Sequence, residues 1–174
     1  MSIIMHRVWA MPNKWTFTIK PIKELLNDIT DDYSNWVDPF AGMNSPCGYT
    51  NDIRESMPTD NHMCALEFLK SLPDTAYDGV LYDPPYSMTQ AKECYESAGL
   101  KNLAGSMRWW ADLKDQIARI VKPDGLVISF GWNSNGMGKK RNFMLDRILL
   151  VPHGGSKNDT IVTVEHKLPV ESEH

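Results

Sequence analysis

The tetrapeptide Asp83-Pro84-Pro85-Tyr86 combines residue types that suit reaction at an exocyclic amino group of a nucleic-acid base. Such an amine is a poor nucleophile because its lone pair is delocalised into the ring. A carboxylate (Asp83) and a carbonyl (Pro84) that accept its protons favour a pyramidal nitrogen with an available lone pair. The prolines restrict the backbone that carries the carbonyl, and Tyr86 offers a ring on which an extruded base can stack. The alternative is a proline-rich turn that only ends a strand.

Two further segments carry acidic and small residues at expected strand ends. Asp38-Pro39-Phe40-Ala41-Gly42 follows the apolar residues Trp36 and Val37, and Asp52 lies near the end of Tyr49–Ile53. A carboxylate at the end of a second strand can accept both ribose hydroxyls of a bound nucleoside. The alternative for Asp52 is a simple turn residue.

The elements that must position these motifs alternate between helices and strands. Apolar spacing predicts helices over Lys20–Ile29, Met63–Leu72, Met88–Ala98 and Trp109–Val121. It predicts strands over Trp36–Phe40, Tyr49–Ile53, Tyr77–Tyr82, Leu126–Phe130, Asp146–Pro152 and Asp159–His166. This alternation predicts an α/β fold with a mostly parallel, doubly wound sheet and a C-terminal antiparallel hairpin. Ligands bind beyond the carboxyl ends of such strands, so both motifs should share one rim.

The composition limits which class of protein this chain can belong to. The chain has 174 residues, 42% of them hydrophobic and 23% charged, which is typical of one globular domain. No apolar run approaches the ~20 residues of a membrane span. Three cysteines without CxxC spacing predict reduced thiols in a cytoplasmic protein. The histidines share no ligand spacing, so no metal is expected. Residues 169–174 are expected to form a disordered tail.

The motifs resemble those of a known family. Asp83 to Tyr86 resembles the catalytic motif of S-adenosylmethionine-dependent methyltransferases that act on amino groups of adenine or cytosine in DNA. The Asp form is similar to that of the adenine-specific group. Asp38 to Gly42 resembles the family's cofactor motif, and Phe17 to Pro21 resembles the segment that closes over the methionine end of the cofactor. The motif order resembles that of small phage or prophage adenine methyltransferases over nearly the whole chain.

The resemblance implies a Rossmann-like class I methyltransferase fold and a site-specific DNA adenine methyltransferase. The implied reaction is methyl transfer from S-adenosylmethionine to the N6 amine of a flipped adenine. The implied catalytic residues are Asp83, Pro84, Pro85 and Tyr86. The implied cofactor-binding residues are Thr18, Ile19, Asp38, Pro39, Phe40, Ala41, Gly42, Asp52, Ile53, Cys64 and Asp83.

Other functions remain open. Met43-Asn44 follows Gly42 where the family usually has a second glycine, and Cys64 stands where the family often has an acid. These departures motivate a non-catalytic nucleic-acid-binding module as an alternative. A cytosine N4 or an RNA adenine methyltransferase would use the same motif. Cys47 is rejected as a nucleophile for carbon-5 cytosine methylation, because that cysteine belongs where Asp83 stands.

Substrate recognition must come from short segments. Only 40 residues separate Gly42 from Asp83, and only the tail follows the last strand, so no separate target-recognition domain is expected. DNA would instead contact the rim segments Ser87–Arg108 and Gly131–Arg141. The candidate phosphate contacts are Arg108, Lys139, Lys140 and Arg141, although a solvated helix start explains the last three equally well. Binding should depend on salt, and a homodimer could enlarge the contact surface.

Overall fold

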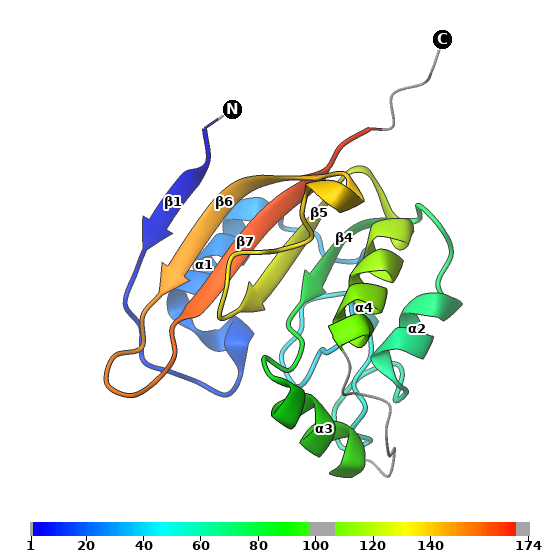
Figure 1. The fold of residues 1–174 in the computed structure, drawn as a ribbon, viewed down its shortest axis with the longest axis horizontal. Coiled ribbons are helices and arrows are strands. Elements are labelled where there is room, and N and C mark those ends of the chain that lie inside the picture. The colour runs from blue at the N-terminus through cyan, green and yellow to red at the C-terminus, as the bar shows by residue number, and fades with distance from the viewer. Residues whose placement is uncertain (1, 98–106, 170–174) are drawn as a thin grey trace.

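A seven-stranded sheet forms the centre of the computed structural model, which describes residues 2–97 and 107–169 (Figure 1). The strands lie in the order β1-β6-β7-β5-β4-β2-β3. Their bounds are β1 (Ile4–Arg7), β2 (Trp36–Asp38), β3 (Tyr49–Thr50), β4 (Tyr77–Tyr82), β5 (Val121–Gly131), β6 (Phe143–Val151) and β7 (Thr160–Lys167). Neighbours are parallel except for β7, which is antiparallel to both β5 and β6. The expected parallel sheet with a C-terminal hairpin is confirmed.

Helices cover both faces of this sheet (Figure 1). On one face α1 (Lys20–Ile29) buries Ile22 and Leu26 against strands β5, β6 and β7. On the other, α2 (Ala65–Ser71) and α4 (Met107–Ile120) pack together over β4 and β5, and α3 (Met88–Ser97) adds Ala91 and Tyr95 to the same core. Two short 3-10 turns, η1 (Thr16–Thr18) and η2 (Lys139–Arg141), complete the elements. Within the described ranges, every helix is too short or too polar to span a bilayer.

Two elements differ from the sequence-based expectation. Residues 122–125, which separate the expected helix Trp109–Val121 from the expected strand Leu126–Phe130, are part of β5, because a register irregularity and the positive φ of Asp124 keep them within the strand. The unpredicted strand β1 pairs in parallel with β6 at the sheet edge. Residues 98–106 of the expected recognition segment Ser87–Arg108, with the end of the helix expected to reach Ala98, lie outside the described residues, as do 170–174 of the expected tail.

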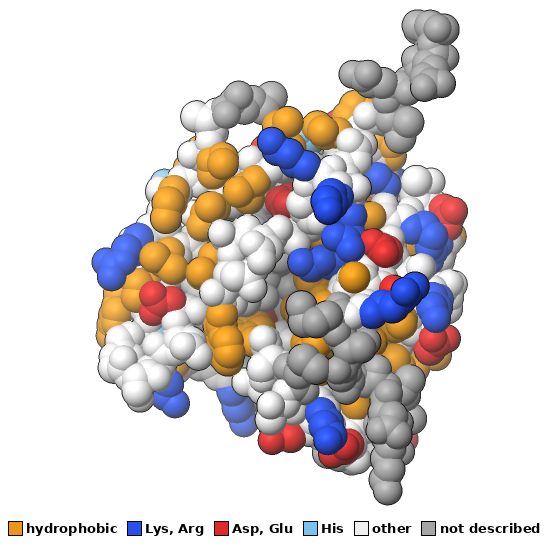
Figure 2. All heavy atoms as spheres, viewed as in Figure 1, with side chains coloured by type: hydrophobic (Ala, Val, Ile, Leu, Met, Phe, Trp, Pro, Cys, Tyr) orange, Lys and Arg blue, Asp and Glu red, His pale blue; other side chains and the backbone are white. Residues whose placement is uncertain are grey.

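Strand β1 lies at a sheet edge, and none of the described helices covers the face of this edge opposite α1 (Figure 1). All four β1 side chains are exposed, so none of the buried-exposed alternation that marks a strand is present. Figure 2 shows hydrophobic side chains gathered at the surface over β1 and β6. Ile3, Met5 and Trp9 are among the large hydrophobic residues that remain exposed. The edge strand is therefore formed by backbone pairing with β6 and not by burial.

Close contact between β2 and β4 requires a glycine in β4. Trp36 of β2 pairs with Gly79 of β4, and Val37 pairs with Val80. A Cβ atom at position 79 would lie 2.5 Å from the Trp36 ring. The buried indole therefore packs directly on the backbone of the strand that leads to Asp83.

Gly79→Ala should lower the free energy of unfolding by about 1–3 kcal/mol, because the added methyl overpacks the contact with Trp36. Gly131→Ala is the matched control, since a Cβ atom added at position 131 would meet no atom within 4 Å and the residue also lies in a strand. It should change stability by less than about 0.5 kcal/mol. Urea denaturation measures both, and equal values for the two variants would contradict the close packing at Gly79.

Candidate functional site

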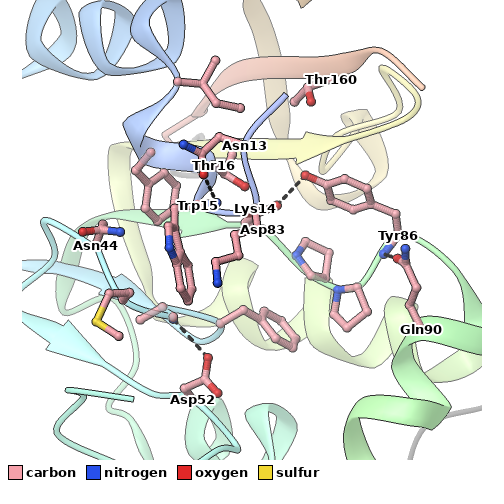
Figure 3. Close-up of a pocket in the computed structure, with 18 of the residues that line it drawn as sticks. Asn13, Lys14, Trp15, Thr16, Asn44, Asp52, Asp83, Tyr86, Gln90 and Thr160 are labelled. Carbon is pink, nitrogen blue, oxygen red and sulfur yellow. Dashed lines mark hydrogen bonds between the residues drawn. The ribbon is translucent and has the colours of Figure 1, made fainter. Parts of the chain in front are cut away.

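The carboxyl ends of β2, β3 and β4 open onto one cavity of about 560 Å³ (Figure 3). Its walls come from the loops after these strands, from the N-terminal segment Pro12–Phe17 and from the turn between β6 and β7. The two sequence motifs that follow β2 and β4 therefore face each other across a single space. This arrangement agrees with the rule that parallel sheets bind ligands at the carboxyl ends of their strands.

Asp38 holds the loop after β2 in place from beneath the cavity. Its carboxylate accepts hydrogen bonds from the Phe40 amide at 3.0 Å and from the Ser45 hydroxyl at 2.7 Å. The side chain is fully buried, and this burial raises the pKa of Asp38 to about 7. Asp38 is not among the residues that line the cavity, so its contribution is to position Pro39 to Gly42.

Asp52 lines the cavity with a carboxylate that already has several donors. Arg54 approaches it with Nε and Nη2, each at 2.9 Å, and with its backbone amide at 2.9 Å. The Gly42 amide donates to the same carboxylate at 3.0 Å. Gly42 has a φ of +58°, which a residue with a side chain rarely adopts. The two cofactor-side loops are therefore tied together, and a ribose would have to share Asp52 with Arg54 or displace it.

Asp83 and Tyr86 face each other at the opposite wall (Figure 3). The Tyr86 hydroxyl donates to Asp83 Oδ1 at 2.8 Å. Burial raises the pKa of the Asp83 carboxyl, and hydrogen bonds from Thr16 and Tyr86 offset part of that rise. The Tyr86 amide donates to Gln90 Oε1 at 2.9 Å, and the Trp132 ring packs edge-on against the Tyr86 ring at 5.4 Å between centroids. The Tyr86 side chain therefore covers the Asp83 carboxylate, which the sequence motif predicts to be catalytic.

The N-terminal segment supplies a wall that sequence reasoning missed. Lys14 lies in the cavity beside Trp15, with its ammonium 4.9 Å from the ring centroid, and Thr16 reaches Asp83 (Figure 3). Buried His153 ties this segment to the hairpin, because its ring contacts the Ala10 carbonyl at 2.9 Å and the Thr160 hydroxyl at 2.8 Å. These residues belong to no periodic element, so only the neighbouring Phe17–Pro21 resemblance pointed toward them.

Most of the expected site residues line the cavity: Ile19, Pro39, Phe40, Ala41, Gly42, Asp52, Ile53, Asp83, Pro84, Pro85 and Tyr86. Besides Asp38, two do not. Thr18 is exposed, and its hydroxyl donates to the Trp15 carbonyl at 2.8 Å, so Thr16 faces the site in its place. Cys64 is buried before α2, and the next residue, Ala65, reaches the cavity instead.

The expected phosphate contacts lie outside the cavity, and Arg141 has a different role. Its Nε donates to Asp115 at 2.7 Å and its Nη2 to the Ala111 carbonyl at 3.3 Å, which ties η2 to α4. Lys139, Lys140 and Arg108 are exposed. A phosphate contact by Arg141 would therefore require it to give up these bonds, whereas both lysines and Arg108 stay predicted contacts.

The loop after β5 is held from two sides, by side chains of β7 and of α4. Buried Glu165 accepts the Met137 amide at 2.6 Å and the Gly138 amide at 3.0 Å. Lys114 donates to the Gly136 carbonyl at 2.5 Å from the other side. A side chain at Gly136 would collide with Glu165, since a Cβ there would lie 2.2 Å from Oε2. Among the described residues no group of three or more potential metal ligands occurs.

Solved structures of methyltransferases share this fold. A 1,6-didemethyltoxoflavin-N1-methyltransferase from Burkholderia thailandensis, solved with S-adenosylhomocysteine bound, matches 77% of this chain and 71% of its own at 12% identity and a TM-score of 0.54. TrmN from Thermus thermophilus matches 86% of this chain and 49% of its own at 16% identity and a TM-score of 0.54. A Haemophilus influenzae protein assigned as a methylase matches 84% and 88% at 14% identity and a TM-score of 0.51. No protein-family model and no curated protein matches the chain.

The chain therefore has the class I methyltransferase fold, with a mostly parallel seven-stranded sheet and an antiparallel strand inserted near one edge. The cavity lies at the strand ends and brings together the residues that follow β2, β3 and β4. At identities of 12 to 16% the likeness extends to the fold and not to the substrate.

The buried Asp38 predicts a pH dependence of stability. Its pKa is about 7 in the folded chain against an ordinary 3.8, so the folded state binds more protons between these values. The free energy of unfolding should therefore fall as pH rises from about 4 to about 7. Asp38→Asn keeps an acceptor for the Phe40 amide, removes the Asp38 part of this slope, and should be more stable than the wild type above pH 7.

Urea denaturation at a series of pH values measures this slope. Asp83 also has a raised pKa, so a smaller slope of the same sign should remain in Asp38→Asn. A slope as steep as that of the wild type would show that Asp38 does not titrate in this range.

Proposed function

We propose that this protein transfers a methyl group from S-adenosylmethionine to the exocyclic N6 amine of adenine in DNA. The observation that supports this most is that Asp83 and Pro84 line the same cavity as Pro39 to Gly42 of the loop that resembles the cofactor motif. A carboxylate and a preorganised carbonyl stand where an amine could approach a donor bound across the cavity. This geometry suits direct transfer, which needs no activated cysteine.

The residues present fit the cofactor. A cavity of about 560 Å³ lies within the roughly 300–1,000 Å³ typical of small-molecule sites. Phe40 and Ile53 offer apolar surface to a purine, Asp52 offers acceptors to a ribose, and the Lys14 ammonium could pair with the methionine carboxylate. Bound S-adenosylmethionine would supply an electrophilic methyl group on its sulfonium.

The reaction then depends on the exchange of partners at Asp83. In the free protein the Tyr86 hydroxyl occupies Asp83, so an entering amine must displace it and donate its own proton there. A second amino proton can bond the Pro84 carbonyl. As the amine took up the methyl group that bound S-adenosylmethionine would supply, its nitrogen would have to give up one proton. The raised pKa of Asp83 makes its carboxylate a better acceptor for that proton.

A non-catalytic module is the second candidate, and the occupied Asp52 carboxylate favours it. If Arg54 never yields to a ribose, the fold could persist without cofactor binding. Calorimetric titration with S-adenosylhomocysteine separates the two, because the methyltransferase should bind it and the module should not. Cytosine N4 and RNA adenine remain alternative substrates for the same Asp83 site, and product analysis of modified nucleosides distinguishes them.

Asp83→Ala should abolish methyl transfer while cofactor affinity stays within about tenfold, or ~1.4 kcal/mol. The reason is that in this proposal the main role of Asp83 is to accept a proton of the entering amine, while most of the cofactor contacts come from other residues. Asp78→Asn is the control, since Asp78 lies on β4, the strand that leads to Asp83, and forms an exposed ion pair with Lys122. Expression in a methylation-free host followed by nucleoside analysis measures the product, and substantial N6-methyladenine from Asp83→Ala would contradict the assignment.

Tyr86 should act mainly through its ring. Tyr86→Ala should weaken nucleic-acid binding by roughly 1–3 kcal/mol, the range for one base stacked on an aromatic side chain. Tyr86→Phe should keep most of that affinity, because it removes only the hydroxyl that leaves Asp83 when an amine enters. Fluorescence anisotropy with a labelled oligonucleotide measures both, and equal losses would assign the affinity to the hydroxyl.

A further inference from the structure

Trp132 is a large aromatic residue that remains exposed at the edge of the candidate site. It directly follows β5, in the rim segment Gly131–Arg141, and its side chain is 42% exposed. Exposure alone means little, because Trp9 on the β1 edge is exposed as well. Trp132 differs from Trp9 because it lines the large cavity and also a second cavity of about 90 Å³, which shares Tyr86 with the first. Its position therefore suits contact with a ligand that reaches the site.

The Trp132 ring stands edge-on to the Tyr86 ring. Their centroids lie 5.4 Å apart, and their planes are inclined by 69°. Within the described part of the chain this is the one ring-to-ring contact of Trp132. Flat stacking needs planes that are close to parallel, so one planar ligand cannot stack on both rings at once. If Tyr86 takes the target base, the face of Trp132 suits a different base.

The spacing of the two rings matches neighbouring bases on one strand. Successive bases of a stacked strand lie ~3.4 Å apart, and unstacking widens that spacing. Two rings with centroids 5.4 Å apart are therefore within reach of two consecutive bases. A base that stacks on Trp132 must first leave its own stack, which costs least in a single strand.

The loop that carries Trp132 is held in place before any ligand binds. The Met137 amide is bonded to Glu165, and the Asn135 amide donates to Asn133 Oδ1 at 3.0 Å. A Cβ atom added at Gly131 would meet no atom within 4 Å, so free space adjoins Trp132 on that side. A stacking surface on a fixed loop loses little conformational entropy when it binds a ligand.

We propose that Trp132 binds the base next to the target base on the same strand, by stacking. This step rests on the proposed function, because it takes Tyr86 as the ring that holds the target base. Every base has a π-face, so stacking on Trp132 adds affinity for nucleic acid with little selection among bases.

The test uses a trinucleotide from which one base at a time is removed. Calorimetry in low-salt buffer with S-adenosylhomocysteine present measures binding of a DNA trinucleotide with a central adenine between two thymines. Two further ligands carry an abasic site directly 5′ or 3′ of the adenine. For the wild type, one of these two should bind at least about fivefold more weakly than the intact trinucleotide, the lower end of the range for one stacked base.

Trp132→Ala should lose affinity for the intact trinucleotide by the same factor, and the abasic site should then cost nothing further. Deoxyadenosine has no neighbouring base, so it should bind the wild type and Trp132→Ala equally. Trp132→Leu keeps an apolar side chain without a flat ring and should behave like Trp132→Ala. Trp132→Phe keeps a ring and should retain most of the affinity.

Trp9→Ala is the matched control, since Trp9 is an exposed tryptophan outside the described lining of both cavities. It should bind all these ligands like the wild type. Urea denaturation identifies any variant that fails to fold. If Trp132→Ala is such a variant, the comparison of Trp132→Leu with Trp132→Phe takes its place.

The outcomes separate this inference from the proposed function. A cost of the abasic site that Trp132→Ala removes, with no N6-methyladenine formed by the wild type, would support the neighbouring-base site and contradict the proposed function. An equal cost in the wild type and Trp132→Ala, or no cost in the wild type at either position, would overturn the neighbouring-base site, whatever the protein methylates. Absence of trinucleotide binding by the wild type would also overturn it. Weaker deoxyadenosine binding by Trp132→Ala would assign the ring to the target base instead.

Discussion

The candidate site depends on the parallel pairing of β2 with β4. Trp36 lies against Gly79 and Val37 pairs with Val80, so the two strands end at the same edge of the sheet. The loop that follows Asp38 and the turn that follows Tyr82 therefore open onto the same cavity. A shift of one residue in this register would turn the alternating side chains to opposite faces and separate the two motifs. Because Gly79 has no side chain, the Trp36 indole can pack against it and fix the register of β2 and β4.

Three carboxylates converge on this rim, and their partners decide which of them can act on a ligand. The repulsion from Asp83 and Asp52 adds to the burial that raises the pKa of Asp38. Asp38 is bonded to a backbone amide and Ser45, and Asp52 to two backbone amides and a guanidinium. Asp83 alone is bonded to two side-chain hydroxyls, which can rotate away without moving the backbone. The fold thus commits Asp38 to support a loop, leaves Asp52 on the cavity wall with Arg54 as a competitor for any ligand, and leaves Asp83 exchangeable.

The sequence predicted those parts of the fold that bury a periodic face. Helix α1 and strand β4 match their predicted bounds, because apolar spacing and proline punctuation coincide there. Strand β1 could not be predicted, since its pairing with β6 is a backbone property and its side chains stay exposed. In the site, motifs identified most of the lining, but Thr16 replaces Thr18 because η1 turns one hydroxyl inward and the other outward. The pairing of Arg141 with Asp115 could not be predicted, because the two residues lie 26 apart in sequence.

Pro84 and Pro85 also determine which polar groups are offered by the wall between the large cavity and a smaller one of about 90 Å³. Pro84 and Pro85 line both spaces, so their backbone would expose polar groups on two sides. Proline has no N–H, and the next amide, that of Tyr86, is already bonded to Gln90. The segment therefore offers no free amide donor to either cavity and keeps only carbonyl acceptors. From this segment, an amine that enters the larger cavity therefore meets carbonyl acceptors and no competing amide donor.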